Sequence, residues 1–126
     1  MDDEEFKEII EKAVESLPQE FKDKIENVAI VVADWPSPEQ QRLIFRQGRG
    51  GLLLGLYQGI PKTKRGNYGV GPTLPDKITI FKIPLLSISA NFEEAVNNIK
   101  DTVIHEIAHH FGMTDEDIMH AKSRKD

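Results

Sequence analysis

The sequence contains no cysteine among its 126 residues. Disulfide bonds and thiolate metal ligands are therefore excluded, so any metal site must be built from His, Asp and Glu side chains. No apolar run approaches the roughly 18 residues that a membrane-spanning helix needs. The acidic N-terminus, Met1–Glu5, also lacks the basic start and apolar core of a secretory signal. Together these absences predict a cytoplasmic protein with no membrane partner.

An excess of basic charge is absent as well, because the formal net charge is −5. A negatively charged protein lacks the general attraction that holds phosphates, so no nucleic-acid partner is expected. Hydrophobic residues make up 39% and charged residues 29%, which is ordinary for a globular protein. This length predicts a single domain over residues 1–126, large enough to bury about two-thirds of its unfolded surface. Nothing in the sequence indicates the oligomeric state.

Hydrophobic periodicity predicts two helices at the start of the chain. Apolar residues recur at helical spacing from Phe6 to Leu17, and acidic residues crowd the first turn, where they complement the helix dipole. Pro18 then favours the opening of a short second helix, because its fixed backbone angle suits the first turn of a helix.

Three apolar segments are typical of strands, and they cover Val28–Ala33, Leu52–Tyr57 and Lys77–Ile83. The first is a continuous β-branched run, which predicts a buried strand. In the second, Gly55 marks a bulge or a close approach of another part of the chain. Residues 39–45 fit a short helix and an irregular loop equally well, and residues 62–76 are expected to form a long surface loop.

A long helix is expected to begin at Asn91, whose spacing to Glu94 is that of a capping box. Its apolar residues form two stripes that surround the last two turns, so we expect these turns to run through the core. Gly112 predicts the end of the helix, because glycine readily adopts the left-handed conformation that reverses the chain. Thr114 is a candidate cap for a final short helix.

The end of this long helix carries the sequence His105-Glu106-Ile107-Ala108-His109, an H-E-x-x-H pattern. Positions four apart lie on one helix face, so His105 and His109 can direct two imidazoles at one metal ion. Glu106 lies roughly 100° around the helix, where its carboxylate can reach a water beside that metal. A chain reversal at Gly112 can return Asp115 as a third ligand. Three protein ligands and one open position are typical of a catalytic zinc site.

A pentad this short also arises by chance, and a histidine on a helix is more often a surface or core residue than a ligand. Three observations favour a metal site. The pentad lies in the most apolar part of the helix, where unpaired His and Glu are costly to bury. A glycine follows where the helix must end, and all four histidines fall between positions 105 and 120. Glu116, Asp117 and His120 compete with Asp115 as third ligand, while His110 is expected to lie outside the ligand set.

In these residues the chain resembles the zincin-like family of small bacterial metallopeptidases. Besides the stretch from His105 to Asp115, the matching segments are Leu17–Pro18, Val28–Val32, Gly55–Pro61, Arg65 and Leu74–Thr79. The full H-E-x-x-H-x-x-G-x-x-D pattern is also similar to the metzincin peptidases, with Asp where His is commoner. The resemblance implies a zincin-like α+β fold in which a small mixed sheet packs on an active-site helix, with the N-terminal helix as a backing helix.

The resemblance further implies a zinc-dependent peptidase that acts on peptide or protein substrates. Zn²⁺ would be held by His105, His109 and Asp115, and Glu106 would act as general base. In larger zincins the strand two before the active-site helix forms a rim that pairs with extended substrate, and by position this rim is Leu52–Tyr57.

The candidate substrate-binding residues are Leu54, Gly55 and Tyr57 of that rim, together with Arg65. Tyr57, Arg65 and Tyr68 are candidate donors to the oxyanion of the reaction, and each is explained equally well by rim packing or by loop solvation.

Two other functions stay open. The chain ends soon after the motif, so no lower cleft wall is expected, and Met119 is too close to Asp115 to form the methionine turn of metzincins. This motivates a zinc-containing module that binds peptides or proteins with weak or no catalysis. A metal-dependent ribonuclease ranks lower, because its phosphate contacts would depend on a single basic group, formed by Arg42, Arg46, Arg49, Lys62, Lys64 and Arg65.

Overall fold

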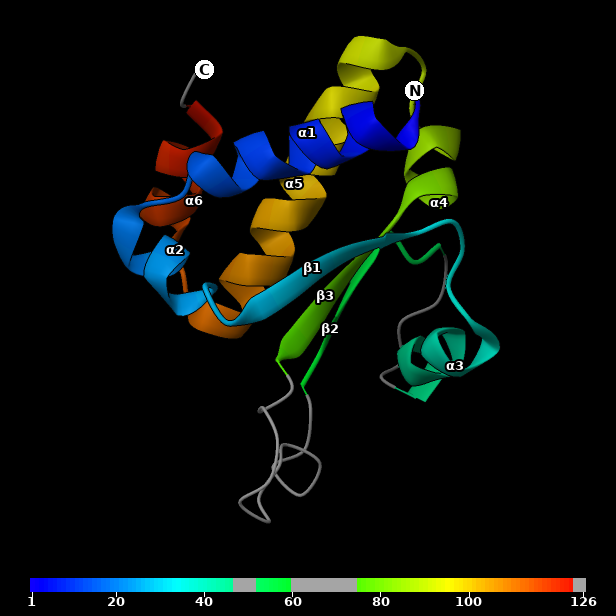
Figure 1. The fold of residues 1–126 in the computed structure, drawn as a ribbon, viewed down its shortest axis with the longest axis horizontal. Helices are drawn as coiled ribbons and strands as arrows, with labels where there is room; N and C mark the ends of the chain where they lie inside the picture. Colours follow the sequence, from blue (N-terminus) through cyan, green and yellow to red (C-terminus); the bar gives the residue numbers. More distant parts are fainter. Residues whose placement is uncertain (47–51, 60–74, 124–126) are drawn as a thin grey trace.

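The computed structural model describes residues 1–46, 52–59 and 75–123. These residues form an α+β fold with a three-stranded mixed sheet, as the sequence predicts (Figure 1). The strands are β1 (Val28–Ala33), β2 (Gly55–Gln58) and β3 (Asp76–Phe81), in the order β1-β3-β2. β1 pairs with β3 in parallel, and β2 pairs with β3 antiparallel. This small mixed sheet is consistent with a zincin-like fold.

Two long helices complete the core. α5 (Phe92–Phe111) packs against β2 and β3, and α1 (Asp3–Glu15) packs against α5 as the predicted backing helix (Figure 1). The shorter helices are α2 (Gln19–Lys24), α3 (Pro38–Arg46), α4 (Lys82–Ser87) and α6 (Asp115–Ser123). In the described part of the chain, no helix has the length and apolar character needed to cross a membrane.

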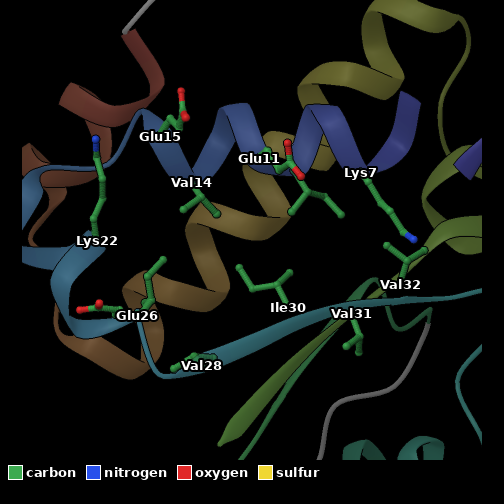
Figure 2. Close-up of a pocket in the computed structure, with 12 residues that line it drawn as sticks. Lys7, Glu11, Val14, Glu15, Lys22, Glu26, Val28, Ile30, Val31 and Val32 are labelled. Atoms are coloured by element: carbon green, nitrogen blue, oxygen red, sulfur yellow. The ribbon is translucent and has the colours of Figure 1, made fainter. Parts of the chain in front are cut away.

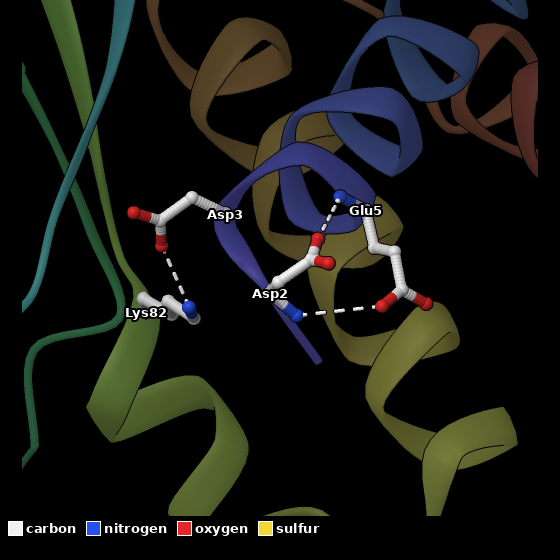
Figure 3. A network of polar contacts seen from close by, with 4 residues as sticks. All are labelled: Asp2, Asp3, Glu5 and Lys82. Carbon is white, nitrogen blue, oxygen red and sulfur yellow. Dashed lines mark hydrogen bonds and ion pairs between the residues drawn. The ribbon is translucent and has the colours of Figure 1, made fainter.

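The start of α1 is fixed by its own first residues. The backbone N–H of Glu5 donates to Asp2 Oδ1 at 2.8 Å, and the backbone N–H of Asp2 donates to Glu5 Oε1 at 3.4 Å, as Figure 3 shows. This capping box satisfies two backbone donors that the helix itself leaves without partners. The buried side of α1 consists of Phe6, Ile9, Ile10 and Ala13. The predicted helical periodicity is therefore confirmed.

The prediction that β1 is a buried strand is wrong. None of its residues is fully buried, and Val31 is 39% exposed. The reason is its place in the sheet, because β1 has a neighbouring strand on only one side within the described residues. On the side of α1 and α2 it borders a hollow of about 720 Å³ with an apolar floor and charged margins (Figure 2). A continuous apolar run does not distinguish such an edge strand from a central one.

Two other segments differ from expectation for local reasons. The third strand ends at Phe81, and α4 follows it, because Pro84 lies in the first helical turn, where a missing N–H costs no hydrogen bond. Residues 39–45, which fit a helix and a loop equally well in the sequence, lie in helix α3, and Ser37 caps this helix. The N–H of Gln40 donates to Ser37 Oγ at 3.1 Å, and the N–H of Ser37 donates to Gln40 Oε1 at 2.9 Å. The expected loop at residues 62–76 lies outside the described residues, except for its last two positions.

Candidate metal centre

The H-E-x-x-H residues lie on the last two turns of α5, whose opposite side is buried. Val103, Ile104, Ile107 and Ala108 pack into the core. His105 and His109 are exposed, and Glu106 is half-buried. The expectation that the core encloses these polar side chains is therefore wrong, because the last turns of α5 are amphipathic. The exposure leaves both imidazoles accessible to an ion and to a substrate.

The imidazole of His105 is oriented by the helix itself. Its Nδ1 lies 2.7 Å from the carbonyl oxygen of Asp101, one turn earlier on α5. A carbonyl can only accept a hydrogen bond, so we assign the ring hydrogen to Nδ1, which leaves the lone pair on Nε2. Histidine ligands of metals are commonly held in this way by a backbone carbonyl. The donor set at His105 thus fits a divalent transition metal such as zinc.

The chain reverses directly after the motif. Gly112 ends α5 with φ 70° and ψ 36°, the left-handed conformation expected from the sequence. Thr114 then caps α6 as expected, since the N–H of Asp117 donates to Thr114 Oγ1 at 3.1 Å. Asp115 is the first residue of α6, and its side chain lies outside the described part of the structure.

The competing ligands differ in their surroundings. The carboxylate of Asp117 accepts the N–H of Thr114 at 3.0 Å, so the cap of α6 already engages it. Glu116 and His120 are exposed on α6. Among the described side chains, which leave out that of Asp115, no three His, Asp or Glu groups surround a point that could hold a metal ion. In this arrangement, His105 and His109 therefore have no third ligand in place among the described side chains.

The strand β2 approaches α5 very closely at Gly55. A Cβ atom placed there would lie 2.9 Å from Thr102 Cγ2, 3.3 Å from Glu106 Cγ and 3.4 Å from Ile80 Cδ1. The first distance is shorter than carbon atoms tolerate, so the sequence expectation of a close approach at Gly55 is confirmed. Because of this contact, the side chain of Glu106 lies beside the strand that the sequence predicts as the substrate rim.

Two residues further along β2, Tyr57 contacts the end of α5. Its ring stacks on His110 with a centroid distance of 4.1 Å and an interplanar angle of 20°, and it meets Phe111 edge-on at 5.8 Å. Its hydroxyl donates to Asp76 Oδ2 at 2.6 Å. The pKa of His110 is lowered, first by loss of solvent around the ring and then by the charge of His109. The sequence spacing did not indicate these contacts.

The other candidate substrate residues are only partly described. Leu54 is half-buried, and its carbonyl oxygen accepts the N–H of Phe81 at 2.9 Å, so it extends the pairing of β2 with β3 by one residue. Arg65 and Tyr68 lie outside the described residues. Met119 is on α6 and is 71% exposed, so it does not form a methionine turn beneath the motif.

A family model described as zincin-like metallopeptidase matches residues 25–124, which include the three strands and the whole H-E-x-x-H motif. A comparison with curated proteins gives no match.

Proposed function

Because the chain belongs to the zincin-like metallopeptidase family, we propose that it is a zinc-dependent peptidase with its site on the last two turns of α5. The observation that carries this proposal is the orientation of His105. Its Nδ1 contact with the carbonyl of Asp101 leaves Nε2 as the free donor atom. This is the ring orientation and the tautomer that a metal-binding histidine needs.

In this proposal, zinc is held by His105, His109 and Asp115. The two histidines are one helical turn apart on the exposed side of α5. Asp115 follows the left-handed turn at Gly112 as the first residue of α6, and α6 packs against α5. Zinc, when bound, would polarise a substrate carbonyl and lower the pKa of an attacking water.

Glu106 is the proposed general base. Its side chain is half-buried, and its Cγ lies against the backbone of β2 at Gly55. The carboxylate would take a proton from the attacking water and deliver it to the leaving amine. Partial burial beside the strand limits the positions that this side chain can adopt, which keeps the carboxylate close to a substrate on the rim.

The proposed substrate is an extended segment of peptide or protein that adds to the free edge of β2. Within the described residues, β2 pairs with β3 alone and so has one unpaired edge. Leu54, Gly55 and Tyr57 would form this rim, and Arg65 stays a proposed contact. A strand of this kind binds a peptide through its backbone, so we expect substrates of many different sequences to be cleaved.

The test compares peptide cleavage and zinc content in the wild type and in Glu106→Gln. We expect turnover to fall by about 10²–10⁴-fold, with zinc content unchanged, because the amide cannot accept the proton. Glu93→Gln is the matched control, since Glu93 is exposed at the other end of α5. Full activity in Glu106→Gln would exclude this residue as the base. If the zinc-loaded wild type cleaves no unfolded protein, a peptide-binding module explains the site better.

The same measurement with Asp115→Ala tests the third ligand. We expect this variant to purify with little or no zinc, because two histidines alone bind the ion weakly. Retention of the full zinc content would direct the search to Glu116 or His120. Cleavage of RNA instead of peptides by the wild type would replace the peptidase proposal with that of a nuclease.

A further inference from the structure

We propose that Tyr57 is a positioning residue, which fixes the last turn of α5 and thereby the orientation of His109. This inference rests on the proposed zinc site and concerns how that site is held. The observation behind it is a continuous series of contacts from Asp76 through Tyr57 and His110 to His109.

One end of the tyrosine is anchored in the sheet. Its hydroxyl donates to Asp76 Oδ2 at 2.6 Å, a short bond of the kind that a charged acceptor makes. Asp76 is the first residue of β3, and Tyr57 lies opposite Ile78 of the same strand. The backbone of Tyr57 is therefore held by strand pairing and its tip by a carboxylate. Both ends of the side chain are fixed to β3.

The face of the ring holds the end of the helix. His110 stacks on it at 4.1 Å, and Phe111 meets it edge-on at 5.8 Å. These two residues are the last of α5 before Gly112 ends it. Helix ends fray because their backbone groups lack helical partners. Two aromatic contacts to an anchored ring oppose fraying in the turn that carries His109.

The last step in the series joins His110 to His109. Their rings lie at a centroid distance of 4.8 Å and an interplanar angle of 86°. Since His110 is held on Tyr57, its ring limits the rotation of His109 toward that side. His109, unlike His105, then owes its orientation to a neighbouring side chain. The two proposed ligands would be positioned by different means, one by a carbonyl within α5 and the other through the sheet.

This role competes with a direct catalytic one for Tyr57. A tyrosine hydroxyl has a single hydrogen, and here it is directed at Asp76. While that bond persists, the hydroxyl cannot donate to an oxyanion on the substrate. The two roles therefore predict different effects for removal of the hydroxyl alone and for removal of the ring.

The experiment measures zinc affinity by competition with a chromogenic chelator in three variants of the full chain. Tyr57→Leu removes the ring contacts, and Tyr57→Phe removes only the hydroxyl. Val32→Ala is a control for general destabilisation, because Val32 pairs with Ile80, away from Asp76, on the far edge strand of the sheet. We expect Tyr57→Leu to weaken zinc binding by about 10–100-fold, as loss of an orienting group does. Tyr57→Phe should weaken it by a few-fold, and Val32→Ala should leave it unchanged.

Hydrogen exchange of the zinc-free protein supplies a second readout. Tyr57→Leu should speed the exchange of the amides at residues 108–111 more than Val32→Ala does. Equal zinc affinity and equal exchange in Tyr57→Leu and the wild type would overturn the positioning role. So would a fall of 100-fold or more in kcat for Tyr57→Phe with zinc affinity unchanged, because that result identifies an oxyanion donor. A wild type that binds no zinc would instead overturn the proposed function itself, and this inference with it.

Discussion

The two edge strands of the sheet differ in how closely the helices pack on them. At β2, the approach to α5 is so close that Gly55 leaves no room for a methyl group, and Tyr57 stacks on the end of the helix. At β1, a hollow of about 720 Å³ separates the strand from α1 and α2 (Figure 2). The tight edge is the one beside the proposed catalytic residues. Precise packing is thus concentrated where side chains must be held for chemistry, and an added methyl group should have opposite effects at the two edges.

The largest effect is expected from Gly55→Ala at the tight edge. The new Cβ would lie 2.9 Å from Thr102 Cγ2 and 3.3 Å from Glu106 Cγ. Thr102 cannot turn away freely, because its hydroxyl donates to the carbonyl of Asn98 at 2.8 Å. Overpacking of this kind costs about 1–3 kcal/mol of stability. We expect that loss in urea unfolding, together with reduced peptide turnover because Glu106 is displaced.

The matched control is Gly59→Ala, just beyond the end of the same strand. A Cβ atom there would meet only Asp76 Oδ1, at an ordinary 3.8 Å. Combining Gly55→Ala with Thr102→Ser should restore part of the stability, because serine lacks the obstructing methyl group and keeps the hydroxyl. If Gly55→Ala and Gly59→Ala unfold at the same urea concentration, the approach of β2 to α5 is looser than its geometry indicates.

A second contrast is expected when the same substitution is made beside the hollow and in the filled core. Val28 lines the hollow beside β1, whereas Val103 of α5 is fully buried. Val28→Ile adds one methylene where there is space, and we expect a gain of up to about 0.8 kcal/mol. Val103→Ile adds it to a filled core, where the expected loss is about 1–3 kcal/mol. Urea unfolding of both variants measures the contrast. Equal destabilisation would mean that the hollow cannot take up added volume.

The sequence predicts those parts of the fold that depend on residues close together in the chain. Helix boundaries are local, so Asn91 and Gly112 mark the two ends of α5 correctly. The capping box at Ser37 and Gln40 was an equally local signal for α3, and the sequence interpretation missed it. The burial of β1 was predicted wrongly, because strand order depends on pairing with residues far along the chain. Periodicity describes one element at a time and contains no information on its neighbours.

The candidate site likewise combines features that follow from local spacing with contacts between distant parts of the chain. The spacing of His105 and His109 places both on one side of α5, and the role of Gly112 follows from its conformational freedom. The contact of Tyr57 with Asp76 spans 19 positions, and no spacing rule connects two residues at that separation. The exposure of the two histidines was also missed, because the apolar residues around them lie on the opposite face of the helix. The proposed ligands could therefore be identified from the sequence, whereas the contacts that other helices and strands make with them could not.

The smallest effect is expected at the polar contact that ties α1 to the start of α4. Asp3 Oδ1 lies 2.6 Å from Lys82 Nζ, as Figure 3 shows. The hydrogen bond from Lys82, and then its charge, lower the pKa of Asp3. A carboxyl group with a lowered folded-state pKa stabilises the protein above its unfolded pKa of about 3.9. That contribution disappears as the pH falls through the lower pKa of the folded state.

The test is the pH dependence of unfolding in Asp3→Asn, compared with Glu4→Gln. Both variants remove an exposed carboxylate from the first turn of α1, so both lose the same favourable interaction with the helix dipole. Only Asp3→Asn also loses Lys82. We expect Asp3→Asn to be slightly less stable than Glu4→Gln at pH 7. The difference should vanish as the pH falls through the lowered pKa of Asp3, and it should also vanish at high salt. Identical pH profiles for the two variants would show that the ion pair adds no stability and that apolar packing alone holds α1 against α5.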